Sequence, residues 1–257
     1  MCTRPIHVYE RVQKNKETGK KIIDFKQIKG IIYAKDYDIP CGKCKDCLLK
    51  KAREWSVRCM HENEFHNEAC FITLTYNNEH LPKNGDEPTL NYKDVQLFMK
   101  RLRKKLSGQN IKVRFFCASE YGGKRKRPHY HILLFGFCPK DLKVFKKSYS
   151  GYLVYKSQLI DELWQCGYCF IGTAIKAECA SYIARYTLEK NKFKGKYFYE
   201  NEKGEKIRDK EKITMSRRKG IGYNWFAKFW KSVSIQGYIR NHNQIISIPK
   251  YYRNVLK

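Results

Sequence analysis

The chain has 257 residues, of which 42% are hydrophobic and 14% aromatic, a composition that can bury a core and argues against intrinsic disorder. Lysine and arginine total 53 against 25 acidic residues, a formal net charge of +28. Such an excess favours a polyanionic partner, because each basic side chain set against a phosphate releases a counterion. We therefore expect a nucleic-acid-binding protein, with a charged solubilising surface as the alternative.

The cellular compartment is predicted from what the sequence lacks. The first 21 residues contain no apolar segment of the signal-peptide kind. No apolar run approaches the roughly twenty residues of a membrane span. Eleven cysteines without a secretory signal indicate free thiols and a metal site rather than a disulfide framework. A reducing cytoplasm without membrane association is the expectation.

Residues 1–65 are predicted to form an N-terminal region that contains the motif "CGKCKDC". Cys41, Cys44 and Cys47 follow a C-x₂-C-x₂-C pattern, and Cys2 could complete a tetrahedral, structural Zn²⁺ site. An iron–sulfur cluster on the same ligands, or reduced cysteines at the start of a helix, are the alternatives.

The predicted core, residues 66–192, follows a helix that is expected after the cysteine motif. That helix has one apolar stripe, formed by Leu48, Ala52, Trp55 and Cys59. The run "ACFITLTY" at 69–76 predicts a strand, and the loop 77–88 bounds it. Asn91 is expected to cap the next helix. Its inner face should carry Val95, Phe98, Leu102 and Leu106, and its outer face Lys100, Arg101, Arg103, Lys104 and Lys105.

Two strands connected by a Gly-Gly turn are predicted next, "IKVRFFCASEYGG" and "RPHYHILLFGF". A short helix over 158–165, a strand over 167–174 and a helix over about 177–190 complete the core. The order β, α, β, β, α, β, α predicts an α+β fold with an antiparallel sheet and helices on one face, ferredoxin-like or RNA-recognition-like.

Residues 193–257 are predicted to form a basic C-terminal extension that packs on the core. The polar, Lys/Gly-rich stretch 191–220 is expected to be mobile. The later runs "YNWFAKFW" and "ISIPKYYRNVL" should be ordered.

Two histidines occupy alternate positions of one predicted strand. His129 and His131 therefore project from the same face, and Tyr130 from the other. Glu120 ends the preceding strand, and the turn through Gly122 and Gly123 could bring it beside them. Two imidazoles and a carboxylate can bind one divalent cation and leave positions open for water and a phosphate. Chance packing of the histidines, and a solvated Glu120, are the alternatives.

Tyrosines recur on the last predicted helix of the core. Tyr182 and Tyr186 are four residues apart on one face, and Lys190 extends that stripe. An ordinary core stripe is one interpretation. Beside a metal site, however, a tyrosine can attack a DNA phosphodiester and form a covalent phosphotyrosine.

The sequence resembles the HUH endonucleases, named for the His-hydrophobic-His strand that here is His129-Tyr130-His131. It is most similar to the replication initiators of single-stranded DNA phages of the microvirus group, especially the gokushovirus branch. The resemblance is carried, in chain order, by "PCGKCKDCLLKKAREWSVR", "FITLTYNNEHLP", "SEYGGKRKRPHYHILLFG", "SYIARY", "MSRRKGIGYNWF" and "SIPKYY".

The resemblance implies a nicking and joining enzyme of rolling-circle replication that acts on single-stranded DNA at the phage origin in the cytoplasm of a bacterial host. Tyr182 and Tyr186 would be the nucleophiles, and His129, His131 and Glu120 would bind Mg²⁺ or Mn²⁺. No Walker-type phosphate loop is present, so a host helicase, with a host polymerase, would complete replication. The expected DNA-binding residues are Thr73, Thr75, Arg127, Lys190, Arg217 and Arg218.

Two other functions are compatible with these features. One is a non-catalytic, RNA-recognition-like nucleic-acid-binding protein in which the tyrosines are core or stacking residues. The other is a metal-dependent nuclease without a covalent intermediate. Covalent capture of an oligonucleotide distinguishes the first from a nicking enzyme, and survival of cleavage without both tyrosines identifies the second.

Overall fold

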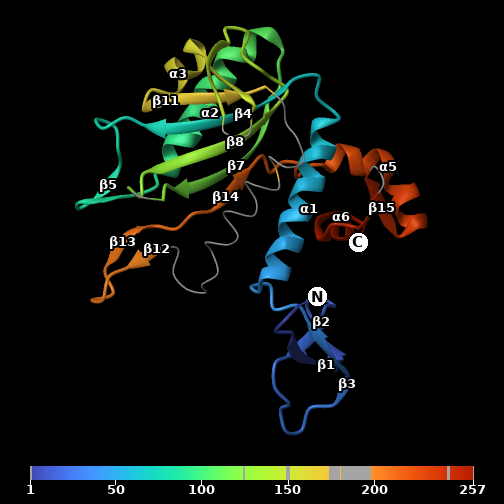
Figure 1. Cartoon of the computed structure of the whole chain (residues 1–257). Helices are drawn as coiled ribbons and strands as arrows, with labels where there is room; N and C mark the ends of the chain where they lie inside the picture. Colours follow the sequence, from blue (N-terminus) through green and yellow to red (C-terminus); the bar gives the residue numbers. More distant parts are fainter. Residues whose placement is uncertain are drawn as a thin grey trace. The chain divides into compact units, whose positions relative to one another are not determined.

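The computed structural model describes residues 2–123, 125–148, 151–173, 180, 198–241 and 244–256 (Figure 1). These form two compact units, Met1–Lys51 and Ala52–Lys257. The domain boundaries expected after residues 65 and 192 stay predictions. Among the described residues, no helix combines the length and the apolar character that crossing a membrane requires.

The first unit contains a three-stranded antiparallel sheet in the order β2-β1-β3. Arg11 on the central strand donates to Asp24 on its neighbour at 2.6 Å, which ties the two strands together. Helix α1 begins after the cysteine motif and continues into the second unit. The bounds are β1 (Ile6–Lys14), β2 (Lys21–Asp24), β3 (Tyr33–Ile39) and α1 (Lys45–Asn63).

A seven-stranded sheet is the centre of the second unit, and all its neighbouring strands are antiparallel. Its order is β14-β7-β8-β4-β11-β10-β9, and Figure 1 shows β14, β7, β8, β4 and β11 side by side. The elements are β4 (Ala69–Tyr76), α2 (Tyr92–Leu106), β7 (Arg114–Tyr121), β8 (Pro128–Phe135), β9 (Lys143–Lys147), β10 (Leu153–Lys156), α3 (Gln158–Trp164), β11 (Gly167–Gly172) and β14 (Ile213–Met215).

The predicted α+β architecture is confirmed. The elements β4, α2, β7, β8, α3 and β11 follow one another in the expected order. Strand β8 lies between β4 and β7, and β4 lies between β8 and β11, which is the split arrangement of a ferredoxin-like core. This order puts the His-Tyr-His strand in the interior of the sheet, where both neighbours fix its register.

Helices α2 and α3 pack on one face of this sheet. All four inward residues expected for α2 are buried, and the Asn91 side chain caps the helix by accepting from the backbone N–H of Lys93. Their partners on the strands include Ile72, Leu74 and Ile132. Arg101, expected on the outer face, instead donates to the backbone carbonyls of Leu163 and Trp164 at the end of α3.

The opposite face of the sheet is also covered in part, which corrects the expectation of helices on one face only. Ala52 and Cys59 of α1 share a buried cluster with Phe116 and Leu133 of the sheet. Trp55 completes the predicted stripe, with its ring centroid 4.9 Å from that of Phe116. Of the helix expected over 177–190, only Ala180 is described; it is helical and buried in this cluster.

The C-terminal region is more ordered than expected. Residues 198–220, which the composition predicts to be mobile, contain a hairpin and the strand β14, which pairs with β7 because Ile213 and Met215 pack beside Phe116. The expected order of the later segments is confirmed by a cluster of Phe226, Val233 and Tyr252. The elements are β12 (Phe198–Glu200), β13 (Lys206–Asp209), α5 (Tyr223–Gln236), β15 (Tyr238–Asn241), β16 (Gln244–Ser247) and α6 (Lys250–Val255).

Two short elements complete the described structure. The loop expected over 77–88 includes a small hairpin of β5 (Lys83–Asn84) and β6 (Glu87–Pro88). A 3₁₀ turn, η1 (Ser107–Gln109), follows α2.

Candidate metal centre

Three potential metal ligands meet on the face of the sheet opposite α2. Glu120 on β7 is the direct Cα partner of His129 on β8, and His131 lies two residues further along β8. Side chains two residues apart on a strand share a face, so all three project together. The tight turn at Gly122 and Gly123 sets this register. The structure thus brings together the three residues that the sequence singled out.

The ligand atoms of these three residues converge. Glu120 Oε2 lies 3.6 Å from His129 Nε2 and 3.4 Å from His131 Nε2. One ligand atom from each residue falls within 4.8 Å of both others. The side chains are 11%, 19% and 12% exposed for Glu120, His129 and His131, so the cluster is half-buried yet open to solvent. Two imidazoles and one carboxylate suit a divalent cation that keeps open positions.

Hydrogen bonds orient both imidazoles. His129 Nδ1 lies 3.3 Å from the carbonyl oxygen of Arg127, which can only accept, so Nδ1 carries the proton and Nε2 keeps its lone pair for a ligand. His131 Nδ1 lies 3.0 Å from Thr73 Oγ1 on β4. The Phe71 ring stacks at 5.5 Å from that of His131. Such contacts fix the ring orientation that metal binding requires.

The electrostatics favour a carboxylate at this position. Burial opposes ionisation of Glu120, but hydrogen bonds and charge from His129 and His131 outweigh it and hold the pKa of Glu120 well below its ordinary value. Glu120 is therefore an anion over the physiological pH range and matches the charge of a cation.

The candidate nucleophiles belong to a different part of the chain. Tyr182, Tyr186 and Lys190 lie outside the described residues, so their roles stay predictions.

Three expected DNA-binding residues lie close to the cluster. Thr73 contacts His131, whereas the Thr75 hydroxyl donates to the carbonyl oxygen of Tyr168 on β11 at 2.9 Å. The Arg127 guanidinium donates to the carbonyls of Tyr76 and Asn77 at 3.0 and 3.1 Å. Arg127 therefore also fixes the loop that follows β4.

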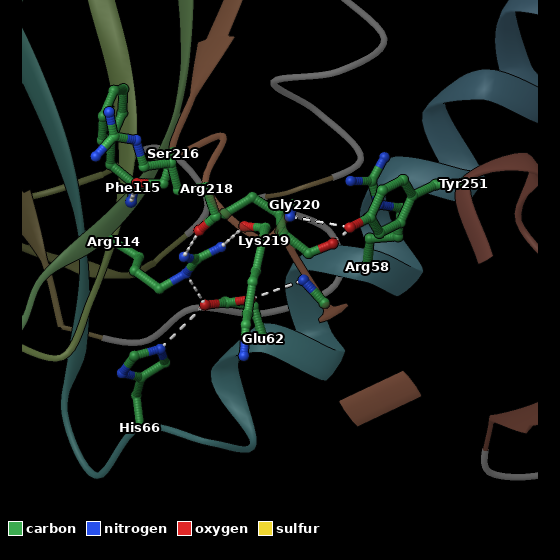
Figure 2. Close-up of polar contacts among 12 residues, drawn as sticks. Arg58, Glu62, His66, Arg114, Phe115, Ser216, Arg218, Lys219, Gly220 and Tyr251 are labelled. Atoms are coloured by element: carbon green, nitrogen blue, oxygen red, sulfur yellow. Dashed lines mark hydrogen bonds and ion pairs between the residues drawn. The ribbon is translucent and has the colours of Figure 1, made fainter. Parts of the chain in front are cut away.

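The other described basic residues expected to bind DNA, Arg217 and Arg218, are exposed on the segment between β14 and α5. Figure 2 shows how this segment is fixed: Arg114 of β7 donates to the carbonyl of Arg218 at 3.1 Å and also to that of Lys219. The Arg114 guanidinium is held in turn by the buried carboxylate of Glu62. The backbone is thus bonded inward while the basic side chains remain exposed.

Glycine is required where this segment enters α5. Gly222 has φ +79°, and its N–H donates to Glu62 Oε2 at 2.7 Å. A Cβ at this position would lie 2.3 Å from the Tyr252 hydroxyl and 2.9 Å from the Arg58 carbonyl oxygen. A larger residue would therefore displace the segment that carries Arg217 and Arg218.

The four cysteines singled out by the sequence form a second cluster, within the first unit. The sulfurs of Cys2, Cys41, Cys44 and Cys47 all lie within 4.8 Å of one another, and Cys2 Sγ is 3.8 Å from Cys44 Sγ. Backbone hydrogen bonds lower the pKa of Cys44 to about 5, whereas burial raises the pKa of Cys47 to about 12. This cluster is a second possible metal-binding group.

Sequence reasoning misses the contact between Thr73 and His131. It assigns Thr73 only to a surface that faces DNA, because the register of β4 against β8 is needed to see that Thr73 lies opposite His131. The alternation of "FITLTY" is the available signal, since it sets Thr73 and Thr75 on one face.

Comparisons with known proteins agree with the geometry. The family model described as replication-associated protein ORF2 matches residues 69–192, the part that contains the sheet and both histidines. Replication-associated protein VP4 of Bdellovibrio phage phiMH2K is 33% identical over 263 residues, covering 100% of this chain and 77% of the relative. Replication-associated protein ORF2 of Spiroplasma virus 4 is 32% identical, covering 86% and 76%.

A third relative, replication-associated protein ORF4 of Chlamydia phage 1, is 29% identical and covers 86% of this chain and 54% of the relative. No solved structure gives a significant match.

Proposed function

Because the chain belongs to the family of microvirus replication-associated proteins, rolling-circle replication initiators, we propose that it nicks and rejoins single-stranded DNA at the phage origin. The observation that carries the proposal is the convergence of Glu120, His129 and His131 on one face of the sheet. The arrangement fits the HUH endonuclease pattern of two histidines beside a third ligand.

In this proposal Glu120, His129 and His131 bind Mg²⁺ or Mn²⁺ with a carboxylate oxygen and two Nε2 atoms. The bound cation polarises the phosphoryl oxygens and offsets the charge that develops on them. Thr73 and the Arg127 carbonyl hold the two imidazoles so that both Nε2 atoms face Glu120. The half-buried position excludes most bulk water and leaves the open side for the phosphate.

The proposed nucleophiles are Tyr182 and Tyr186. The phenolic oxygen attacks phosphorus and loses its proton to solvent; the P–O3′ bond breaks, and the departing oxygen takes up a proton to leave a 3′-hydroxyl. The DNA is then joined to the tyrosine through its 5′-phosphate. Attack by a 3′-hydroxyl on this phosphotyrosine reverses the step and rejoins the ends without an external energy source.

DNA binding is proposed to depend mainly on charge. Each lysine or arginine set against a phosphate adds affinity that falls with salt. Arg217 and Arg218 are exposed on a segment whose backbone Arg114 binds, and this supports their role as phosphate contacts. Arg127, Thr73, Thr75 and Lys190 complete the proposed set.

We also propose that Cys2, Cys41, Cys44 and Cys47 bind a structural Zn²⁺. In a tetrahedral site with Zn–S bonds of about 2.3 Å, neighbouring sulfurs lie about 3.8 Å apart. The distance between Cys2 and Cys44 matches this value. The backbone N–H groups of Lys43 and Cys44 donate to Cys41 Sγ, which stabilises a thiolate there.

The proposed setting is the cytoplasm of the bacterial host. A host helicase would separate the strands, and a host polymerase would extend the 3′-hydroxyl that nicking leaves.

The test mixes the protein, Mn²⁺ and a labelled single-stranded phage-origin oligonucleotide, and separates the products under denaturing conditions. A labelled band that stays attached to protein supports the proposal. Binding without cleavage would favour a non-catalytic binding protein. Cleavage that persists when Tyr182 and Tyr186 both become Phe would favour a metal-dependent nuclease without a covalent intermediate.

A further inference from the structure

The face of the sheet that carries the metal ligands continues outward as a surface of aromatic rings and lysines. Strand pairing aligns His131, Thr73 and Phe170 in one row across β8, β4 and β11. A second row aligns His129 and Thr75 with Tyr168. Because directly paired residues project from the same face, Tyr168 and Phe170 share the face of the metal ligands.

These rings are available at the surface. Tyr168 is 54% exposed and Phe145 on β9 is 48% exposed. The ring centroids of Phe145 and Phe170 are 5.5 Å apart, so the two form one continuous apolar platform. Large rings left this exposed on a sheet lose the stabilisation that burial would give them, and a function can explain their position.

Two lysines lie over the same rings. Lys156 Nζ is 4.6 Å from the ring centroid of Phe145 and 5.6 Å from that of Tyr168. Lys146 Nζ is 5.8 Å from the centroid of Phe145. We call Phe145, Lys146, Lys156, Tyr168 and Phe170 the aromatic–lysine patch. It combines flat stacking surfaces with positive charge and, among these five residues, contains no acid.

We propose that the aromatic–lysine patch binds single-stranded DNA, with bases stacked on Tyr168 and Phe145 and phosphates beside Lys156 and Lys146. This inference rests on the proposed function and adds the path of the strand. Unpaired bases expose the faces that stack on aromatic rings, whereas a duplex hides them; the combination therefore selects single strands.

The patch is close enough to serve the metal centre. Two strand spacings separate the backbone of Phe170 from that of His131, about 10 Å at the usual spacing of neighbouring strands. Nucleotides held on the patch would therefore be only a few bases from a phosphate at Glu120. Thr75 links the two regions, since its hydroxyl bonds the Tyr168 carbonyl while its strand neighbour Thr73 contacts His131.

The experiment measures binding of a fluorescent oligothymidylate by anisotropy, without added Mg²⁺ or Mn²⁺, so that the result is independent of cleavage. Tyr168→Ala and Phe145→Ala should each weaken binding about five- to hundredfold, the range of losing one stacked base. Trp230→Ala is the matched control, since Trp230 is a 43% exposed aromatic residue on α5. It should bind like the wild type.

The salt dependence separates rings from charges. Lys156→Gln should make the plot of log affinity against log salt shallower by about 0.7, the value for one phosphate contact on a single strand. Tyr168→Ala should leave this slope unchanged. A second readout, Tyr168→Trp, should retain affinity and show indole quenching when oligothymidylate is added.

The idea is overturned if Tyr168→Ala and Phe145→Ala bind oligothymidylate as the wild type does, if they weaken duplex binding equally, or if Tyr168→Trp shows no quenching. A protein that binds through the patch but never cleaves would contradict the proposed nicking alone. A protein that nicks but ignores the patch substitutions would contradict this inference alone.

Discussion

Glu120 and His129 face each other as direct Cα partners on β7 and β8, with Glu120 Oε2 3.6 Å from His129 Nε2. The two residues are nine positions apart in sequence, and the hairpin turn between them fixes this meeting. The same pairing sets His131 opposite Ala118, whose small side chain leaves room for the imidazole beside Glu120. The metal centre is thus a product of strand register.

Replacing both His129 and His131 with Ala should abolish metal-dependent nicking and leave most DNA binding intact. Affinity comes mainly from the net charge of +28, whereas these side chains supply two of three metal ligands. Gel-shift and nicking assays on the same oligonucleotide make the comparison. Equal loss of binding and cleavage would contradict the assignment.

Thr73 and Thr75 provide a matched pair on one strand. Thr73→Val removes the hydroxyl beside His131 Nδ1 and should lower the affinity for activating Mn²⁺ about tenfold to hundredfold, the usual effect of losing a residue that orients a ligand. Thr75→Val removes a hydroxyl that bonds a backbone carbonyl and should leave Mn²⁺ affinity close to wild type. Titration of nicking with Mn²⁺ measures both, and identical curves would contradict a role for Thr73.

The cysteine site predicts bound metal. Protein purified without chelator should contain about one equivalent of zinc, and Cys44→Ser should lose it together with stability. Cys138→Ser is the control, because Cys138 lies outside the cluster. Inductively coupled plasma analysis and thermal unfolding provide the readouts. Wild-type protein with neither zinc nor iron would rule the site out.

Stability should depend on pH through His61 of α1, which stacks on Trp225 with ring centroids 3.5 Å apart. Burial lowers the pKa of His61 to about 3. Below pH 6.5 the unfolded chain binds a proton that the folded chain refuses, so the free energy of unfolding falls as the pH drops from 6.5 to 3. The slope from this group is at most about 1.4 kcal/mol per pH unit.

Urea denaturation across this range tests the effect. His61→Gln should lose this part of the slope, whereas His80→Gln, in an exposed loop, should retain it. The interpretation fails if all three proteins show the same dependence on pH.

The central fold can be predicted because its signals are strong. "ACFITLTY" alternates buried and half-buried positions along β4, and Asn91 with a regular apolar stripe predicts α2. The edges cannot be predicted in this way. All five residues of β9 are exposed, so hydrophobicity carries no trace of the strand, and β14 has only three residues. The sheet of the first unit is missed for the same reason: most of β1 is exposed or half-buried.

For the site, residue types and the turn are enough to predict Glu120, His129 and His131 as a group. The contact of Thr73 with His131 and the rows that connect the metal centre to Tyr168 and Phe170 depend on the register of strands far apart in sequence. No local pattern contains that register. Only the three-dimensional structure reveals such long-range pairing.

The proposed mechanism requires that a tyrosine of this chain become covalently joined to DNA. We expect Tyr182 to make the first cut and Tyr186 to serve the later exchange, so that Tyr182→Phe loses most initial nicking and Tyr186→Phe nicks once and fails to release a joined product. The direct measurement is peptide mapping, by mass spectrometry, of the adduct formed with Mn²⁺ and a single-stranded phage-origin oligonucleotide. We predict DNA on Tyr182 first; DNA first on Tyr186 would reverse the order, and DNA on neither tyrosine would contradict the mechanism.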